Sequence, residues 1–513
     1  MKQQDNCFSS PKLLKKYKPI LGDKREHDMG IKNRRQFLEE SMLAAATAAA
    51  ATTPAIVAAQ DVQSKSPNEK LGVAVVGVRG RGGSHIGAFA GRQDTEILYI
   101  CDADRDVGGR RAEEVGKRQG GKVPVFEEDI RKVLEDDRVD IVSIATPNHW
   151  HALGAIWAIQ AGKDVYVEKP VSHNVSEGAR IVEAARKYNR ICQTGTQSRS
   201  NPGMQSLIDF VQSGGIGEVK VARGLCYKRR KSIGERGTYA PPKNVNYDLW
   251  LGPAPEKQVS RPQFHYDWHW QTDYGNGDLG NQGIHQMDIA RWGLNIDHLC
   301  VSTLSYGGRF GYVDAGNTAN TQVVSHGYGE KSLIFEVRGL ETSDYKGAKI
   351  GVIFEGTEGY AVCPSYHNGT AFDKDGNQIK SFSGGGDHFA NFVKAVRARD
   401  HKLLNADIRE GHLSSALCHL GNISLNCGGN LDIDKAKEAL DKHISQDDVH
   451  DTFQRTLAHG KDNNVDYAVT PFSFGELLEI NPEDESIVGN EKASQMLSRE
   501  YRKPFEVPAA GQV

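Results

Sequence analysis

Short apolar runs alternate with amphipathic stretches over residues 71–193, which predicts alternating strands and helices. The run at 141–145 is almost wholly apolar, as a central strand of a parallel sheet must be. Expected strands occupy 71–76, 96–100, 123–126, 141–145 and 165–167; expected helices begin near 85 and cover 105–120, 128–135, 152–161 and 176–188. This order predicts a doubly wound α/β domain over residues 71–193.

Residues 194–430 favour strands that are separated by glycine-rich turns, which predicts a large, mostly antiparallel sheet. The expected strands are 219–227, 299–306, 321–325, 332–338, 349–354 and 360–363, followed by helices at 387–399 and 409–425. Residues 431–513 are polar with one helical stretch and are expected to form a C-terminal extension. The expected fold class is α/β: an N-terminal Rossmann dinucleotide-binding domain, then an α+β domain with a large open, mostly antiparallel sheet.

The first 59 residues have the pattern of a twin-arginine export signal. Arg34 and Arg35 precede a Phe-Leu pair, an alanine-rich apolar stretch at 42–51 and the small residues of a cleavage site at 57–59. The apolar stretch is too short for a good membrane span. We therefore expect a periplasmic or otherwise exported protein, carried by the twin-arginine translocase, with a linker at 60–70. The alternative is a cytoplasmic protein with an amphipathic start.

The composition describes a soluble globular protein, because 38% of residues are hydrophobic and 25% are charged. The net charge of −3 has no long basic block in the body, which argues against nucleic-acid binding. Loss of residues 1–59 removes ten Lys/Arg and six Asp/Glu, so the mature chain is near −7 (−3 minus 4). Eight cysteines stand singly without a CxxC pair, which favours buried free thiols over a thiolate zinc site.

A glycine-rich turn follows the first expected strand and suits a dinucleotide phosphate. Gly77 and Gly82 hold the first and third places of a GxGxxG pattern, while Arg79 takes the second place and Gly80 follows it. Asp102 lies twenty residues after Gly82, where an acidic side chain binds the ribose hydroxyls of NAD. NAD is the expected cofactor; NADP stays possible, since Arg105 and Arg110 lie near Asp102 in the sequence.

The strand at 165–167 ends in Glu168, Lys169 and Pro170. Proline cannot continue the ladder, so the two charged residues lie at the carboxyl end of the strand. Ligands bind at that edge of a parallel sheet, which predicts a functional lysine.

A second cluster of polar residues lies in the run 280–292. If this run is helical, Asn281, His285 and Asp288 share one face. Histidine is suited to accept a hydroxyl proton near neutral pH. Asp288 either orients the imidazole or caps a surface turn.

From about residue 71 to 430 the chain resembles the Gfo/Idh/MocA oxidoreductases, the family of glucose–fructose oxidoreductase and inositol dehydrogenase, and its extension resembles exported bacterial members. The matching motifs are the glycine turn, Asp102, Pro147 with His151, Glu168-Lys169-Pro170, Gly195-Thr196-Gln197 and the segment 283–288. The resemblance implies that His285 is the catalytic histidine and that Lys169 lies between the substrate oxygen and the nicotinamide ribose. Many members carry aspartate where this chain has Asn281. A homo-oligomer is expected as well.

The expected site combines catalytic, cofactor-binding and substrate-binding residues, with no metal. A histidine-aspartate run at 265–269 could supply metal ligands, but the interleaved aromatic residues favour a wall for a sugar. The catalytic residues are Lys169 and His285. The cofactor residues are Gly77, Arg79, Gly80, Arg81, Gly82, Asp102, Arg105, Thr146, Asn148, His151, Glu168 and Lys169; the substrate residues are Gln197, Arg199, Tyr227, Trp268, Asn281 and His285.

The resemblance and the export signal together predict an oxidoreductase that acts on a sugar or polyol hydroxyl with Lys169 and His285 assisting. Because an exported enzyme has no free NAD pool, we expect it to keep its nicotinamide cofactor bound and to return the hydride within its cycle. One alternative is an NAD-dependent glycosidase that works by transient oxidation. The other is a non-catalytic sensor that binds NAD and a sugar.

Overall fold

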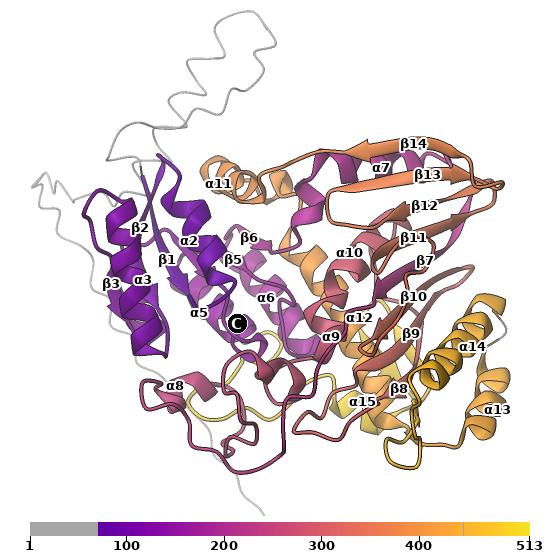
Figure 1. The fold of residues 1–513 in the computed structure, drawn as a ribbon. Helices are drawn as coiled ribbons and strands as arrows, with labels where there is room; N and C mark the ends of the chain where they lie inside the picture. The colour runs from indigo at the N-terminus through magenta and orange to yellow at the C-terminus, as the bar shows by residue number, and fades with distance from the viewer. Residues whose placement is uncertain (1–69, 445) are drawn as a thin grey trace, which may run out of the picture. The chain divides into compact units, whose positions relative to one another are not determined.

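The computed structural model of the protein describes residues 70–444 and 446–513. The export signal predicted for residues 1–59 lies outside these residues. The described chain forms two α/β bodies, each built on its own sheet (Figure 1). Among the described residues, no helix is both long enough and apolar enough to cross a bilayer.

The first sheet has six parallel strands in the order β3-β2-β1-β4-β5-β6, so the predicted doubly wound domain is confirmed. The order reverses between β1 and β4, and a ligand crevice forms at such a point, outside the carboxyl ends of the strands. The strands are β1 (Leu71–Val76), β2 (Thr95–Cys101), β3 (Val125–Glu127), β4 (Ile141–Ile144), β5 (Asp164–Val167) and β6 (Cys192–Thr194).

Side chains alternate across this sheet and bury both of its faces. In β1, Val73 and Val75 pack in one core cluster, whereas Ala74 and Val76 pack in the other. The first cluster includes α2 (Gly82–Ala90), α3 (Arg105–Arg118) and α11 (His388–Ala398); the second includes α4 (Ile130–Leu134), α5 (Asn148–Gln160) and α6 (Val175–Lys187). The sheet is therefore covered on both sides, as a parallel sheet requires.

The second sheet has twelve strands and is antiparallel except for the pair β7 and β10, which confirms the predicted open sheet. Its main path is β14-β13-β12-β11-β7-β10-β9-β8-β16-β15. The strands are β7 (Val219–Cys226), β8 (Ser302–Gly308), β9 (Thr321–Tyr328), β10 (Lys331–Arg338), β11 (Ile350–Gly356), β12 (Gly359–Cys363), β13 (Asn368–Asp373), β14 (Gln378–Ser383), β15 (Gly429–Asn430), β16 (Ser473–Phe474), β17 (Leu478–Asn481) and β18 (Ser486–Val488).

Helices cover both faces of the large sheet. One core cluster joins it to α7 (Pro202–Gln212), α9 (Gly277–Asn281), α10 (Gly283–Gly293) and α12 (Ile408–Cys427). On the opposite face lie α13 (Ile433–His443) and α14 (Asp447–Asp462), where Phe453 packs on Tyr306 of β8. The prediction of a single helix in the extension was wrong, because α13, α14 and α15 (Glu491–Gln495) all follow residue 430. The strands of the extension are too short to show a periodic pattern.

A long connection joins β7 to α9 and contains only two short helical turns, α8 (Tyr247–Leu251) and η3 (Asp267–Trp270). It has a small core of its own, formed by Val245, Trp250, Phe264 and Tyr274 with their neighbours. In Figure 1, α8 lies beside the Rossmann domain and not beside the large sheet. This connection therefore brings residues of the second domain to the dinucleotide crevice.

Candidate active site

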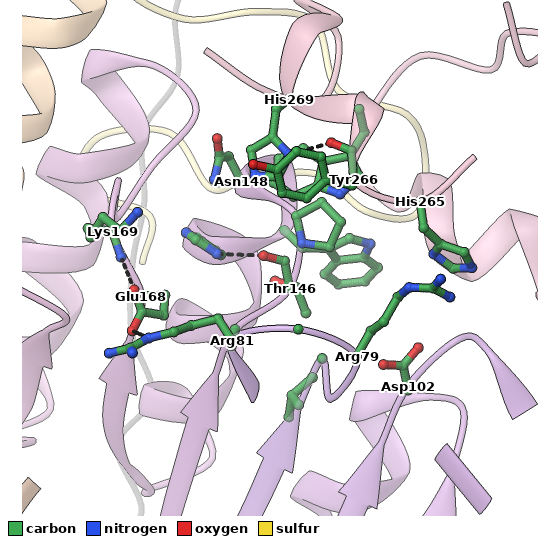
Figure 2. Close-up of a pocket in the computed structure, with 18 of the residues that line it drawn as sticks. Arg79, Arg81, Asp102, Thr146, Asn148, Glu168, Lys169, His265, Tyr266 and His269 are labelled. Carbon is green, nitrogen blue, oxygen red and sulfur yellow. Dashed lines mark hydrogen bonds and ion pairs between the residues drawn. The ribbon is translucent and has the colours of Figure 1, made fainter. Parts of the chain in front are cut away.

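A cavity of about 640 Å³ lies at the carboxyl ends of β1, β4 and β5 (Figure 2). The Rossmann domain supplies one wall, and residues of the β7–α9 connection, α9 and α10 supply the other. Most predicted site residues line it: Gly77, Arg79, Gly80, Arg81, Asp102, Thr146, Asn148, His151, Glu168, Lys169, Gln197, Trp268, Asn281 and His285. The structure thus brings the predicted cofactor and catalytic residues together.

The glycine-rich turn is set by close backbone packing. Gly77 has φ +78°, and a Cβ there would lie 2.6 Å from the amide nitrogen of Thr146. A Cβ on Gly82 would lie 2.0 Å from the carbonyl oxygen of Gly77, so this close approach requires glycine; Gly82 begins α2 and does not line the cavity. Gly80 differs, since nothing lies within 4 Å of its Cβ position, and this open space faces the crevice.

Asp102 is held at the end of β2 by two backbone hydrogen bonds. Its carboxylate accepts from the amide of Val78 at 2.8 Å and from the amide of Asp104 at 2.9 Å. Burial raises the pKa of Asp102 to about 6, although these hydrogen bonds oppose the effect. Figure 2 shows Arg79 above Asp102, pointing toward His265. Arg105 does not line the cavity; its side chain pairs at 2.8 Å with Glu128, which does line it.

Two polar groups on the Rossmann side of the cavity lack hydrogen-bond partners in the described chain and suit a dinucleotide. Thr146 Oγ1 and Asn148 Oδ1 are buried and have no hydrogen-bond partner among the described residues. Helix α2 begins without a side-chain cap, and nothing else in the described chain lies within 4 Å of the Cβ position of Gly80, so a phosphate could approach the backbone of the turn there. The glycine turn, Asp102 and these two polar atoms are the groups that would hold the phosphates and the ribose of NAD.

Glu168 links the glycine turn to the end of β5. Its buried carboxylate accepts from Arg81 Nε at 2.7 Å and contacts His85 Nε2 at 3.1 Å. Burial would raise the pKa of Glu168, but the hydrogen bond from His85 and the charge of Arg81 hold that pKa well below its usual range. Glu168 is therefore an anion that fixes the strand end from which Lys169 projects.

Lys169 is half-buried, and its ammonium donates a hydrogen bond to the backbone carbonyl of Asn281 at 2.7 Å. Burial lowers the pKa of Lys169, and the neighbouring charge of Glu168 counteracts this. The hydrogen bond joins the Rossmann wall to the second domain at the last residue of α9. A carbonyl at the end of a helix is a favourable partner for a cation.

His285 lies in the first turn of α10 with 9% of its surface exposed. Burial and the nearby charge of Lys169 hold the pKa of His285 well below its usual range, so the ring is neutral near pH 7. The ring of Tyr366 lies 4.7 Å away, centroid to centroid. A neutral imidazole and a half-buried lysine thus line one cavity beside the Rossmann residues expected to hold NAD.

The prediction that Asn281, His285 and Asp288 share one face of a helix was wrong. The run is split into α9 and α10 at Gln282, so Asn281 ends one helix and His285 lies in the first turn of the next. Asp288 neither orients the imidazole nor caps a surface turn: it is fully buried and accepts from Arg199 Nε at 2.8 Å and Ser414 at 2.8 Å. The ion pair of Asp288 and Arg199 joins α10 to the turn that contains Arg199.

Two predicted substrate residues do not line this cavity. Arg199 forms ion pairs with Asp288 and with Glu410, whose Oε2 lies 3.1 Å from Arg199 Nη2. Tyr227 lies on the other side of the large sheet, where its hydroxyl donates to Glu336 at 2.7 Å beside Arg455 of α14. Tyr227 ends a predicted strand and Arg199 follows the Gly195-Thr196-Gln197 motif, but partners distant in the sequence bind both side chains and hold them outside the site.

The structure adds aromatic and imidazole side chains that the sequence did not single out as site residues. Tyr366 and His367 reach the cavity from the loop between β12 and β13, and Trp250 reaches it from α8. His265, Tyr266 and His269 line it with Trp268, which agrees with an aromatic wall. In the described part of the chain, no group of three or more His, Cys, Asp or Glu is arranged to hold a metal. The adjacent pair Tyr366-His367 after a strand was the available signal.

Comparisons with known proteins agree with this architecture. The oxidoreductase family model with an NAD-binding Rossmann fold matches residues 71–196, and the model for the family's C-terminal alpha/beta domain matches residues 224–459. The alpha-N-acetylgalactosaminidase of Shewanella oneidensis is 32% identical over 156 residues, which are 29% of this chain and 34% of that enzyme. The chain thus matches about one third of the length of this curated relative.

Solved structures show the same fold at low identity. The WlbA dehydrogenase of Chromobacterium violaceum, in complex with NADH and UDP-GlcNAcA, is 19% identical with a TM-score of 0.50 and covers 69% of this chain and 93% of its own. The aldose-aldose oxidoreductase of Caulobacter crescentus is 16% identical with a TM-score of 0.51 and covers 67% and 94%. With both domain models matched in order, the chain belongs to the Gfo/Idh/MocA family of NAD-binding oxidoreductases.

Proposed function

We propose that the protein oxidises a hydroxyl group of a sugar or polyol with an NAD that stays bound, and that the hydride returns within the same cycle. The observation that carries this proposal is that Lys169 and neutral His285 line one cavity beside the Rossmann residues that would hold NAD. NAD, when bound, accepts the hydride and gives it back. His285 accepts the hydroxyl proton and later returns it, while the Lys169 ammonium stabilises negative charge on the substrate oxygen.

The asparagine at position 281 does not alter the hydrogen bond that holds Lys169. Lys169 is held by the backbone carbonyl of Asn281, and this contact does not depend on which side chain the residue carries. An asparagine side chain in the cavity still binds a hydroxyl, but it adds no negative charge beside His285. The base therefore stays weakly basic in the free protein, as its low pKa indicates.

A carbohydrate suits the second wall of the cavity. Tyr266 and Trp268 present aromatic rings, and such rings pack against the apolar faces of sugars. The related structures support this choice: WlbA was solved with UDP-GlcNAcA, and the Caulobacter crescentus protein is named an aldose-aldose oxidoreductase. An enzyme of the latter kind transfers a hydride between two sugars, which is the cycle proposed here.

The second candidate is a glycosidase that works by transient oxidation. The similarity to an alpha-N-acetylgalactosaminidase favours it, although the match covers only 29% of this chain. The same residues would serve, because a transient ketone makes the neighbouring C–H acidic before the leaving group departs. A non-catalytic sensor is the third candidate, and the pairing of Lys169 with a neutral His285 argues against it.

The first test asks whether the cofactor stays bound through turnover. Protein purified without added nucleotide should release NAD on denaturation, and an aldose mixed with a second carbonyl sugar should give oxidised and reduced products in equal amounts. Free reduced nucleotide, formed in proportion to oxidised sugar and dependent on added NAD, would indicate an ordinary dehydrogenase. Release of the leaving group from a glycoside without net oxidation would indicate the glycosidase. If the protein holds NAD but no sugar reacts, the non-catalytic sensor would be the remaining candidate.

We further propose export through the twin-arginine translocase, on the basis of the leader sequence alone. Replacing Arg34 and Arg35 together with lysine should leave the protein in the cytoplasm, because the translocase recognises the arginine pair. Cell fractionation with an antibody against the folded body measures this, and Lys32→Arg is a matched control that should be exported normally. Mature double variant found outside the cytoplasm would contradict the signal assignment. The homo-oligomer stays a prediction.

A further inference from the structure

The β7–α9 connection, residues 228–276, is called the roof segment here, because it lies over the dinucleotide crevice. Six of its residues line the cavity opposite the glycine turn: Leu249, Trp250, His265, Tyr266, Trp268 and His269. Figure 2 shows His265, Tyr266 and His269 on the far side of the cavity from Arg81 and Glu168. A dinucleotide on the Rossmann wall would therefore have the roof segment against its other side.

The roof segment is attached to the Rossmann domain immediately after Asp102. The amide of Arg105 donates to the carbonyl of Asn244 at 2.9 Å, and the amide of Asn246 donates to the carbonyl of Ala103 at 2.8 Å. These bonds form a short antiparallel bridge between Asp104 and Val245. The attachment thus lies two residues from the carboxylate expected to bind the ribose.

Asp104 is the central side chain of this attachment. It is 3% exposed, and it caps α3 by accepting from the amides of Asp106 and Val107. The same carboxylate accepts from Asn244 Nδ2 at 2.6 Å and contacts His265 Nε2 at 3.1 Å. Hydrogen bonds to a buried carboxylate are stronger than those between neutral groups.

A second attachment lies at the start of α5, on the other side of the glycine turn. The indole Nε1 of Trp150 donates to the carbonyl of Leu249 at 2.9 Å, and His149 Nε2 contacts the carbonyl of Trp250 at 2.9 Å. Because β2 and β4 flank β1 in the sheet, the two attachments lie on either side of the turn that follows β1. The roof segment therefore spans the phosphate-binding turn.

We propose that the roof segment is part of the dinucleotide site and that its attachment at residues 103–105 controls the release of NAD. On this proposal the dinucleotide leaves only after the hydrogen bonds to Asp104 and its neighbours break, since six residues of the roof segment line the crevice opposite the glycine turn. This inference rests on the proposed function in one respect: it explains how NAD remains bound through a closed cycle. It names Asn244, which lies outside the cavity, as a residue that retains the cofactor.

The test measures the release of labelled NAD from variants of Asn244. Purified protein is loaded with radiolabelled NAD, chased with excess unlabelled NAD, and sampled for bound label without any sugar. Asn244→Ala loses one hydrogen bond to a buried carboxylate and should release label roughly tenfold faster. Asn244→Asp places a second negative charge beside Asp104 and should release it faster still. Melting curves of both variants verify that the body stays folded.

A matched control lies within the same segment. Tyr239 donates its hydroxyl to the carbonyl of Glu235, inside the roof segment, so Tyr239→Phe should leave the release rate unchanged. Equal release from all variants and the wild type would overturn the inference, as would equal acceleration by Tyr239→Phe. Failure of the proposed function is a separate outcome. If no closed cycle is found but Asn244→Ala still releases NAD faster, the roof segment retains the cofactor and only the proposed function is wrong. If the closed cycle is found but the Asn244 variants release NAD at the wild-type rate, the proposed role of the roof segment is wrong and the proposed function stands.

Discussion

Replacing Lys169 with methionine is expected to lower turnover by at least ~100-fold, the lower end for losing a group that stabilises a developing oxyanion. Methionine keeps the unbranched, flexible shape of the side chain but removes the ammonium that donates to the carbonyl of Asn281 at 2.7 Å. Charge on the substrate oxygen would then develop without a cation beside it. Single-turnover measurements of oxidised sugar, made on protein shown to hold NAD, separate this effect from loss of the cofactor.

The same variant has a second readout that a merely structural lysine would not give. The charge of Lys169 contributes to the low pKa of His285, so Lys169→Met should raise that pKa, which the ring proton resonances report in a pH titration. Lys132→Met is the matched control, because the Lys132 side chain is 65% exposed and does not line the cavity. Normal turnover by Lys169→Met with NAD bound, or an unmoved pKa of His285, would contradict the assigned role.

The Rossmann half could be predicted because its central strands β1, β4 and β5 are buried at every position and are mostly apolar. The predicted strand at 96–100 differs from β2 by one residue at each end. Strand β6 was missed because it includes polar residues whose partners come from elsewhere: Gln193 donates to the carbonyl of His388, 195 residues away. Its last residue, Thr194, also lies one position beyond the predicted domain boundary at 193.

The second domain shows where the hydrophobic pattern stops being informative. Strands β13 and β14 were not predicted, since β14 is almost entirely exposed and carries no alternation to detect. They form a hairpin whose existence depends on pairing with β12. The polar extension was similarly underestimated, although Phe453 and Leu440 bury it against the sheet. Tertiary contacts, and not local propensity, determine these elements.

The candidate site was predictable where a topological rule applied. Lys169 was found from the end of a parallel strand, and the order of the sheet puts β5 next to β4 and its Thr146 turn. No such rule predicts the position of Arg199, because its guanidinium pairs with Asp288, which lies 89 residues away in the sequence. Tyr366 was missed because its only local signal is the adjacent pair Tyr366-His367 after a strand, and its contact with His285 exists only in the folded chain.

Replacing His285 with alanine is expected to lower turnover by at least ~100-fold, the lower end for loss of a general base. NAD should stay bound, because the predicted cofactor residues lie in the Rossmann domain and the variant leaves them intact. The truncated side chain leaves space for a small base, so added imidazole should restore part of the activity. His367→Ala, also in the cavity wall, is the matched control and should gain nothing from imidazole.

The pH dependence of the rescued variant distinguishes a base from a structural histidine. In the wild type, burial and Lys169 hold the pKa of His285 well below its usual range, so the ring remains a competent base as pH falls toward 6.5. Added imidazole is protonated in bulk solution, where burial does not lower its pKa, so less of the neutral base reaches the cavity and the rescued rate should fall as pH decreases through that range. A rescued rate that follows the wild-type profile, or turnover of His285→Ala close to wild type without imidazole, would exclude His285 as the base. The proton would then have to leave through another group in contact with the substrate, and Lys169, whose pKa is itself lowered by burial, is the remaining titratable candidate of the predicted pair.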